Sequence, residues 1–128
     1  MRDAITSDKI ARPVGPFSPA VRGENVIYLS GQVGQEPVTG KMIDGGVGEQ
    51  AARALENVKV VLEAAGRSMG DVLRVGIFLV DMKDFAVVND VYARYFAAPY
   101  PARTTVAVAA LPLGALVEIE AIAAMRGG

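Results

Sequence analysis

The chain has 128 residues, with 13 lysines and arginines against 14 aspartates and glutamates, so its formal net charge is −1. This length fits one domain over residues 1–128. The lack of a basic excess argues against nucleic acid or an anionic membrane as a partner. No histidine and no cysteine is present, which excludes disulfides, thiolate nucleophiles, cysteine-ligated metals and the usual general base.

The first ten residues carry charges throughout, and no apolar run is long enough to cross a membrane. We therefore expect a cytoplasmic protein. Apolar residues nevertheless make up 52% of the chain, and the mean hydropathy is +0.31. This is high for a small monomer, so the surplus apolar surface predicts an oligomer interface.

The first half of the chain predicts two extended segments and a helix. Residues 12–20 contain three prolines, which favours a loop or an edge strand. Residues 26–29 (VIYL) read as a strand, and the glycine-rich stretch 30–48 as a hairpin or loop. Apolar residues at a spacing of three and four predict an amphipathic helix over 48–65, which Gly66 ends.

The second half predicts strand, helix, strand and strand. Residues 72–81 are nearly all apolar, as in a central strand that is buried on both faces. Asp84 is a suitable N-cap for a second helix, which Pro99 ends and whose apolar stripe consists of Phe85, Val88, Tyr92, Tyr95 and Phe96. Residues 103–111 and 116–125 are predicted strands around a turn at 112–115.

This order of elements predicts an α+β domain in which the helices cover only one face of a single sheet. The uncovered face is apolar, so we expect other subunits to cover it. Three local motifs have ordinary structural explanations. Residues 34–42 depart from the spacing of a phosphate loop, residues 45–48 are a flexible start of a helix, and Asp81 with Asp84 is better explained by helix capping than by a metal.

Arg103 and Glu118 are the charged residues that most merit attention. Arg103 follows a proline-rich turn, and it is either a solvated cation at a strand end or a bidentate ligand for a carboxylate. Glu118 and Glu120 share the face of the last strand opposite the core. If the last two strands form a hairpin, Arg103 and Glu118 lie about 16 Å apart along the sheet. They would then meet only across a subunit interface.

Seven segments in order resemble the RidA/YjgF family of small trimeric enamine/imine deaminases. The segments are GPFSPA (15–20), SGQ (30–32), TG (39–40), the 50–66 helix with Asn57 and its AAG ending, FLVDMKDFAVVNDVY (78–92), PAR (101–103) and VEIEAIA (117–123). The resemblance implies a chorismate-mutase-like α+β fold: one mixed sheet with two helices on one face, assembled as a homotrimeric barrel with sites at the subunit interfaces. It also implies hydrolysis of 2-aminoacrylate, 2-iminopropanoate and 2-iminobutanoate to 2-keto acids and ammonia, without metal or cofactor.

Residue by residue, the resemblance implies that Arg103 grips the substrate carboxylate and that Glu118 holds the attacking water. It implies a substrate-binding set that consists of Phe17, Ser30, Gly31, Asn89, Tyr92 and Thr105, the last through its backbone amide. Two features depart from many relatives: Phe17 replaces a frequent tyrosine, and the 97–102 loop is shorter. Phe17 keeps open a second reading, a non-catalytic trimeric module that binds small 2-keto acids. A ribonuclease fits poorly with the acidic pI and the lack of histidine.

Overall fold

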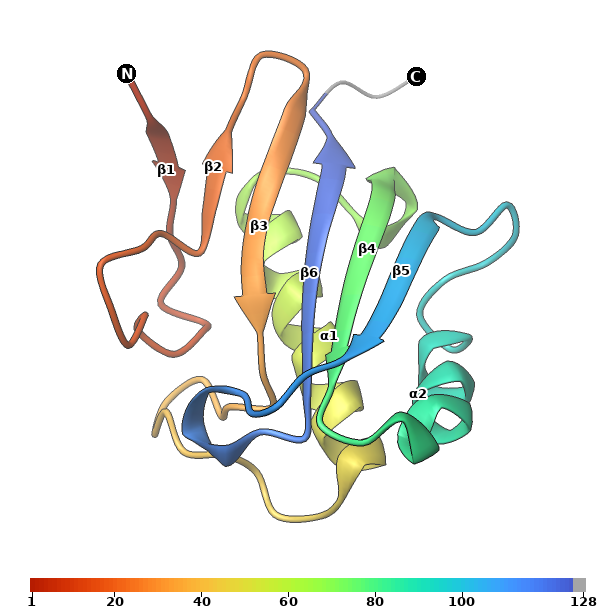
Figure 1. The fold of residues 1–128 in the computed structure, drawn as a ribbon. Helices are drawn as coiled ribbons and strands as arrows, with labels where there is room; N and C mark the ends of the chain where they lie inside the picture. The colour runs from red at the N-terminus through yellow and green to blue at the C-terminus, as the bar shows by residue number, and fades with distance from the viewer. Residues whose placement is uncertain (126–128) are drawn as a thin grey trace.

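One mixed six-stranded sheet organises the computed structural model, which describes residues 1–125; residues 126–128 of the predicted domain lie outside this range. The elements in chain order are β1 (Asp3–Ile5), β2 (Ala20–Arg22), β3 (Val26–Gln32), α1 (Val47–Ala64), η1 (Met69–Asp71), β4 (Val72–Leu79), η2 (Met82–Asp84), α2 (Phe85–Tyr92), β5 (Ala102–Ala107), η3 (Pro112–Gly114) and β6 (Val117–Ala124). In space the strands run β1-β2-β3-β6-β4-β5 (Figure 1). Only β4 and β5 are parallel neighbours.

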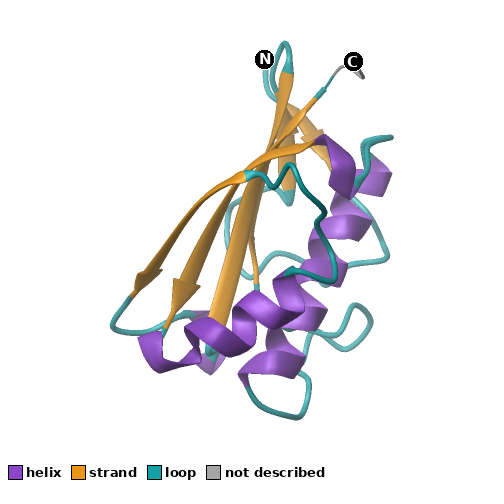
Figure 2. Ribbon diagram, turned by 90° about the vertical axis from the view of Figure 1, so that its right-hand side faces the viewer, coloured by secondary structure: helices purple, strands orange, loops and turns teal. Residues whose placement is uncertain are grey.

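Both α-helices lie on one side of the sheet, and no α-helix of the described residues 1–125 lies on the other side (Figure 2). The core lies between the helices and the sheet. There Leu55 and Leu62 of α1 pack with Ile77 and Ile119 of the central strands, and all four are at most 1% exposed. Strand β6 alternates strictly, with one face buried and the other half-buried. The predicted α+β sheet with its helices on one face is confirmed.

The start and end of α1 agree with the predicted helix over 48–65. Glu49 accepts a hydrogen bond from the backbone N–H of Gly46 at 3.1 Å, so residues 45–48 do start a helix. At the other end Gly66 takes a positive φ of 74°, which glycine adopts without a steric penalty. Neither helix in the described part of the chain is both long and apolar enough to span a membrane.

The predicted hairpin between the last two strands is wrong. Strand β5 pairs only with β4, in parallel, whereas β6 inserts between β3 and β4. The segment 108–116, which includes η3, is long enough to carry the chain past β4 to the middle of the sheet. A tight turn would have forced the two strands to be neighbours, and this longer connection does not.

Strand β4 does lie between two others, but it is not buried on both faces as predicted. Val75, Ile77 and Leu79 point into the core, whereas Leu73 is 53% exposed. The physical reason is that the helices cover one face only, so alternate residues of β4 remain open in the single chain. The apolar run in β4 therefore indicates a sheet face that the helices leave uncovered.

The second helix differs from the prediction at both ends. Asp84 makes no side-chain capping hydrogen bond, because the preceding η2 turn already holds it in a helical conformation. Instead Asp81 accepts a hydrogen bond from the N–H of Lys83 at 2.9 Å. Helix α2 ends at Tyr92, well before Pro99. Of the predicted apolar stripe, Phe85 is 40% exposed and Tyr95 is half-buried, while Val88, Tyr92 and Phe96 are buried.

Candidate functional site

A cavity of about 280 Å³ lies where the end of β3, the start of β6, η3 and the 14–17 loop meet. It contains four of the residues that the sequence singled out: Phe17, Ser30, Gly31 and Glu118. Its other walls are residues that the sequence did not single out, namely Val14, Val33, Gln35, Pro112 and Leu113. This cavity, named here the glutamate pocket, joins segments that lie far apart in the sequence.

Gly31 lets Glu118 lie flat against β3. A Cβ atom at Gly31 would come within 2.5 Å of Oε2 and 2.7 Å of Cδ of Glu118, which no side chain tolerates without movement. Next to it, the hydroxyl of Ser30 donates a 2.6 Å hydrogen bond to the carbonyl of Ser18. Because this bond ties β3 to the loop that carries Phe17, Ser30 helps to hold the pocket's outer wall as well as lining it.

Two buried polar residues of α1 hold the strand ends that form the pocket. The amide of Asn57, 2% exposed, donates hydrogen bonds to the carbonyls of Val33 and Gln35 at 3.1 and 3.0 Å. Gln50, 5% exposed, accepts one from the N–H of Leu116 at 2.8 Å. Buried polar groups of this kind are costly unless satisfied, so these bonds fix both strand ends relative to the helix.

Burial raises the pKa of the Glu118 carboxyl above its ordinary value, and the neighbouring negative charge of Glu120 raises it further. Within residues 1–125 the Glu118 carboxyl takes part in no hydrogen bond and no ion pair. A carboxylate with a raised pKa is a stronger base than one in water. Glu118 is therefore suited to orient or deprotonate a water molecule.

The remaining candidate residues form a second group between α2 and β5. The guanidinium carbon of Arg103 lies 4.8 Å from the ring centroid of Tyr92 and 5.5 Å from that of Phe85. Thr105 follows on the same face of β5, and Asn89 lies on α2 one turn before Tyr92. The hydroxyls of Tyr92 and Thr105 are buried without a hydrogen-bond partner within residues 1–125.

The structure does not bring the two groups together within one chain. In the sheet register Arg103 is opposite Val75 and Glu118 is opposite Phe78. Val75 and Phe78 are three positions apart on β4, so their side chains point to opposite faces of the sheet. Arg103 accordingly lies on the helix side and Glu118 on the open side. Arg103 and Glu118 are therefore separated within one chain, as predicted, but the prediction rested on a hairpin that does not form.

Only some of the pocket and arginine-contacting residues that were not predicted carry a signal in the sequence. Leu113 lines the glutamate pocket with a φ of 59°, a conformation that costs a leucine about 1–2 kcal/mol. The Leu113-Gly114 pair after Pro112 hints at a tight turn, but it does not reveal that the strained residue is the leucine. Phe85 belongs to the apolar stripe of α2 by spacing alone, and nothing in that pattern places it over Arg103.

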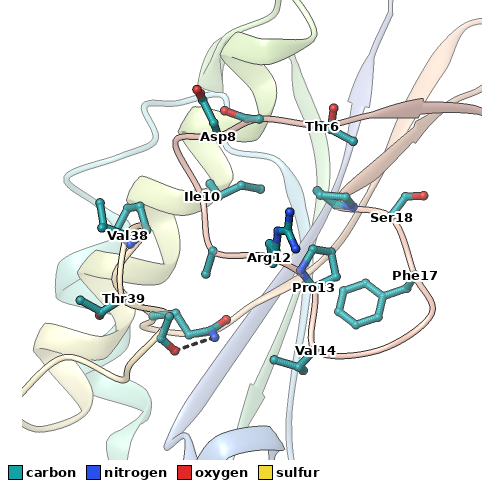
Figure 3. A pocket seen from close by; sticks show the side chains of 16 residues that line it. Thr6, Asp8, Ile10, Arg12, Pro13, Val14, Phe17, Ser18, Val38 and Thr39 are labelled. Carbon is teal, nitrogen blue, oxygen red and sulfur yellow. Dashed lines mark hydrogen bonds between the residues drawn. The ribbon is translucent and has the colours of Figure 1, made fainter.

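A larger hollow of about 990 Å³ lies beside the glutamate pocket, between the 6–19 segment and the 35–40 turn. Figure 3 shows Arg12 reaching into it, with Val14 and Phe17 at its lower edge. Val14, Phe17 and Gln35 line both hollows. The larger hollow contains neither Glu118 nor Arg103, so we place the candidate site in the glutamate pocket. Across residues 1–125 no three acidic side chains gather as a metal site would require.

Comparisons with known proteins give a consistent result. A family model described as endoribonuclease L-PSP matches residues 7–125. A 2-iminobutanoate/2-iminopropanoate deaminase from Bos taurus is 46% identical over 96% of this chain and 90% of its own. A RutC family protein from Pyrococcus horikoshii is 44% identical over 96% of this chain and 98% of its own.

Solved structures agree over nearly the whole chain. RidA from an Antarctic Psychrobacter species has a TM-score of 0.92 at 45% identity, covering 96% of this chain and 99% of its own. E. coli TdcF with bound serine has a TM-score of 0.91 at 39% identity, covering 98% and 99%.

Proposed function

The chain belongs to the RidA/YjgF family, and from this membership we propose that it hydrolyses 2-imino acids and their enamine tautomers to 2-keto acids and ammonia. Relatives at 42–46% identity carry the name of a 2-iminobutanoate/2-iminopropanoate deaminase. The observation in this chain that carries the proposal is Glu118: a carboxyl with a raised pKa, laid over Gly31 in a pocket of about 280 Å³.

The reaction needs no strong nucleophile, because a protonated imine is already electrophilic at its carbon. In the proposed mechanism Glu118 accepts a proton from a water molecule while the water oxygen bonds to the imine carbon, which gives a tetrahedral amino alcohol. Glu118 then returns the proton to the nitrogen and accepts the proton of the new hydroxyl group while the C–N bond breaks, so that ammonia leaves, the 2-keto acid forms, and the proton is finally released to solvent or to the ammonia. Orientation of the substrate and of this water supplies the acceleration.

The substrate carboxylate is assigned to Arg103. Its guanidinium makes no ion pair within residues 1–125, so its donors remain open to an anion of bidentate geometry. TdcF, a relative of this chain, has been crystallised with serine, which is a small molecule with such a carboxylate. The backbone amide of Thr105, two residues further along β5, is proposed as a further donor.

Because Arg103 and Glu118 lie on opposite faces of the sheet, this assignment requires a second subunit. We propose a homotrimer in which the open sheet face of one subunit meets the edge strand β5 of the next, so that each site joins Glu118 of one subunit to Arg103 of its neighbour. The open face carries exposed apolar side chains, among them Tyr28, Leu73 and Val106 at 53%, 53% and 40%. Such a surface favours association over a free monomer.

The test is the decay of 2-iminopropanoate generated in place by an amino-acid oxidase. The wild-type protein should accelerate it, and Arg103→Ala and Glu118→Gln should each lose most of the acceleration. Arg94→Ala and Glu63→Gln remove matched charges from exposed positions away from the pocket and should retain it. A wild-type protein without acceleration, or an Arg103→Ala variant as active as the wild type, would contradict the deaminase proposal.

A second candidate is a non-catalytic module that binds small 2-keto acids at the same site. The observation that favours it is Phe17, a 48% exposed ring at the pocket wall that has no hydroxyl to offer to a reacting group. Calorimetry with 2-ketobutanoate separates the two candidates. Binding that requires Arg103, together with a flat imine assay, would establish the module.

A further inference from the structure

Arg103 is held by two aromatic rings. Its guanidinium carbon is within about 6 Å of both ring centroids, the range of a cation–π interaction. Arg103 is half-buried, and no hydrogen bond or ion pair from its side chain exists within residues 1–125. A cation that has lost part of its hydration is thus stabilised by π faces rather than by a carboxylate.

Phe85 and Tyr92 reach the arginine from one face of α2, because residues seven positions apart on a helix lie almost in line. Tyr92 is 5% exposed and also packs against Phe96, with the two rings tilted by 35° and their centroids 4.5 Å apart. Phe85, at 40% exposure, is poorly placed to contribute to the core. Core packing therefore explains the ring at position 92. The ring at position 85 is explained by its contact with Arg103.

We propose that Phe85 and Tyr92 form an aromatic seat that fixes the plane of the Arg103 guanidinium, with Phe85 as a positioning residue for carboxylate recognition. Each ring attracts the guanidinium charge through its π face and accepts no conventional hydrogen bond, so the N–H donors of Arg103 stay available to a carboxylate. The inference rests on the proposed function and adds a residue that neither the sequence pattern nor the pocket lining had indicated.

The experiment compares Phe85→Leu, which removes the ring, with Phe85→Tyr, which keeps it. Cation–π contributions of this kind predict a KM for 2-iminobutanoate that is raised about 2- to 30-fold in Phe85→Leu, with little change in kcat. Phe85→Tyr should restore a near wild-type KM. Val87→Ala, an apolar truncation on the same helix at a 46% exposed position, is the matched control and should leave KM unchanged. Urea unfolding of each variant shows that the fold is intact.

A double-mutant cycle, measured as 2-ketobutanoate affinity, links the effect to the arginine: Phe85→Leu should weaken binding in the wild type and have no further effect beside Arg103→Ala. Three results would overturn the seat and leave the deaminase proposal standing. They are an unchanged KM in Phe85→Leu, a rise in KM in Phe85→Tyr as large as that in Phe85→Leu, or an equal loss of 2-ketobutanoate affinity from Phe85→Leu in the wild-type and Arg103→Ala backgrounds. If the wild type hydrolyses no imine, the proposed function fails, and the same 2-ketobutanoate titrations decide on the seat. A wild type that neither hydrolyses the imine nor binds 2-ketobutanoate would overturn both the proposed function and the seat.

Discussion

Gly31→Ala tests whether the position of Glu118 sets the rate of the proposed reaction. The new Cβ would lie 2.5, 2.7 and 2.9 Å from Oε2, Cδ and Cγ of Glu118. Since non-bonded heavy atoms settle at about 3.5 Å, the carboxyl must retreat by about 1 Å. A displacement of about 1 Å of a reacting group costs up to about 100-fold in rate, so we expect kcat to fall about 10- to 100-fold.

The same substitution should cost little stability. All three close atoms belong to the end of a flexible side chain, and Gly31 has no positive φ that alanine would strain. We expect the free energy of unfolding, measured with urea, to fall by less than is typical of an overpacked core, which is about 1–3 kcal/mol. The assay is imine decay, with kcat determined at saturating substrate.

Gly76→Ala is the matched control, because its Cβ would press on Glu120 instead, at 2.9 Å from Cγ. Its stability should change by a similar amount, while kcat stays within about threefold of the wild type, since Glu118 is not displaced. A folded Gly31→Ala variant with wild-type kcat would show that the position of Glu118 does not set the rate. So would equal losses of kcat in the two variants.

Three further predictions concern single side chains. Glu120→Gln removes a negative charge that raises the pKa of Glu118, so the acidic limb of the kcat/KM profile should move to lower pH; a shift to higher pH would contradict this cause. Tyr92→Phe deletes a buried hydroxyl that has no hydrogen-bond partner among the described residues, and the free energy of unfolding should rise by up to about 1 kcal/mol. Leu113→Gly relieves a φ of 59°, so the strain of about 1–2 kcal/mol should offset the lost side chain and leave the urea midpoint unchanged or higher.

The sequence predicted the elements that local patterns determine. Helix α1 follows from its apolar spacing and Gly66, and the two faces of β6 follow from strict alternation at Glu118 and Glu120. These patterns depend only on neighbours in the chain, so a single sequence carries them. The resemblance to a known family added the roles of residues such as Arg103, which periodicity alone left open between a binding group and a solvated cation.

What could not be predicted depends on which segments meet in space. Strand pairing is an example: nothing in residues 103–125 says that β6 lies between β3 and β4, and consecutive strands are often neighbours. The packing of Gly31 on Glu118 and of Phe85 on Arg103 likewise joins residues that are distant in the sequence or on different elements. The apolar run in β4 had two explanations, a buried strand or an uncovered sheet face, which only the position of the helices separates.

In the proposed trimer each site takes Glu118 from one subunit and Arg103 from its neighbour, and assemblies of mixed subunits test this sharing. Arg103→Ala and Glu118→Gln subunits, each expected to have lost most of its activity, are unfolded together in equal amounts and refolded. If neighbouring subunits share sites, about one quarter of the interfaces in randomly mixed trimers will combine an intact Glu118 with an intact Arg103. About one quarter of the wild-type activity should then return. Activity no higher than that of the two separately refolded variants would contradict the shared site.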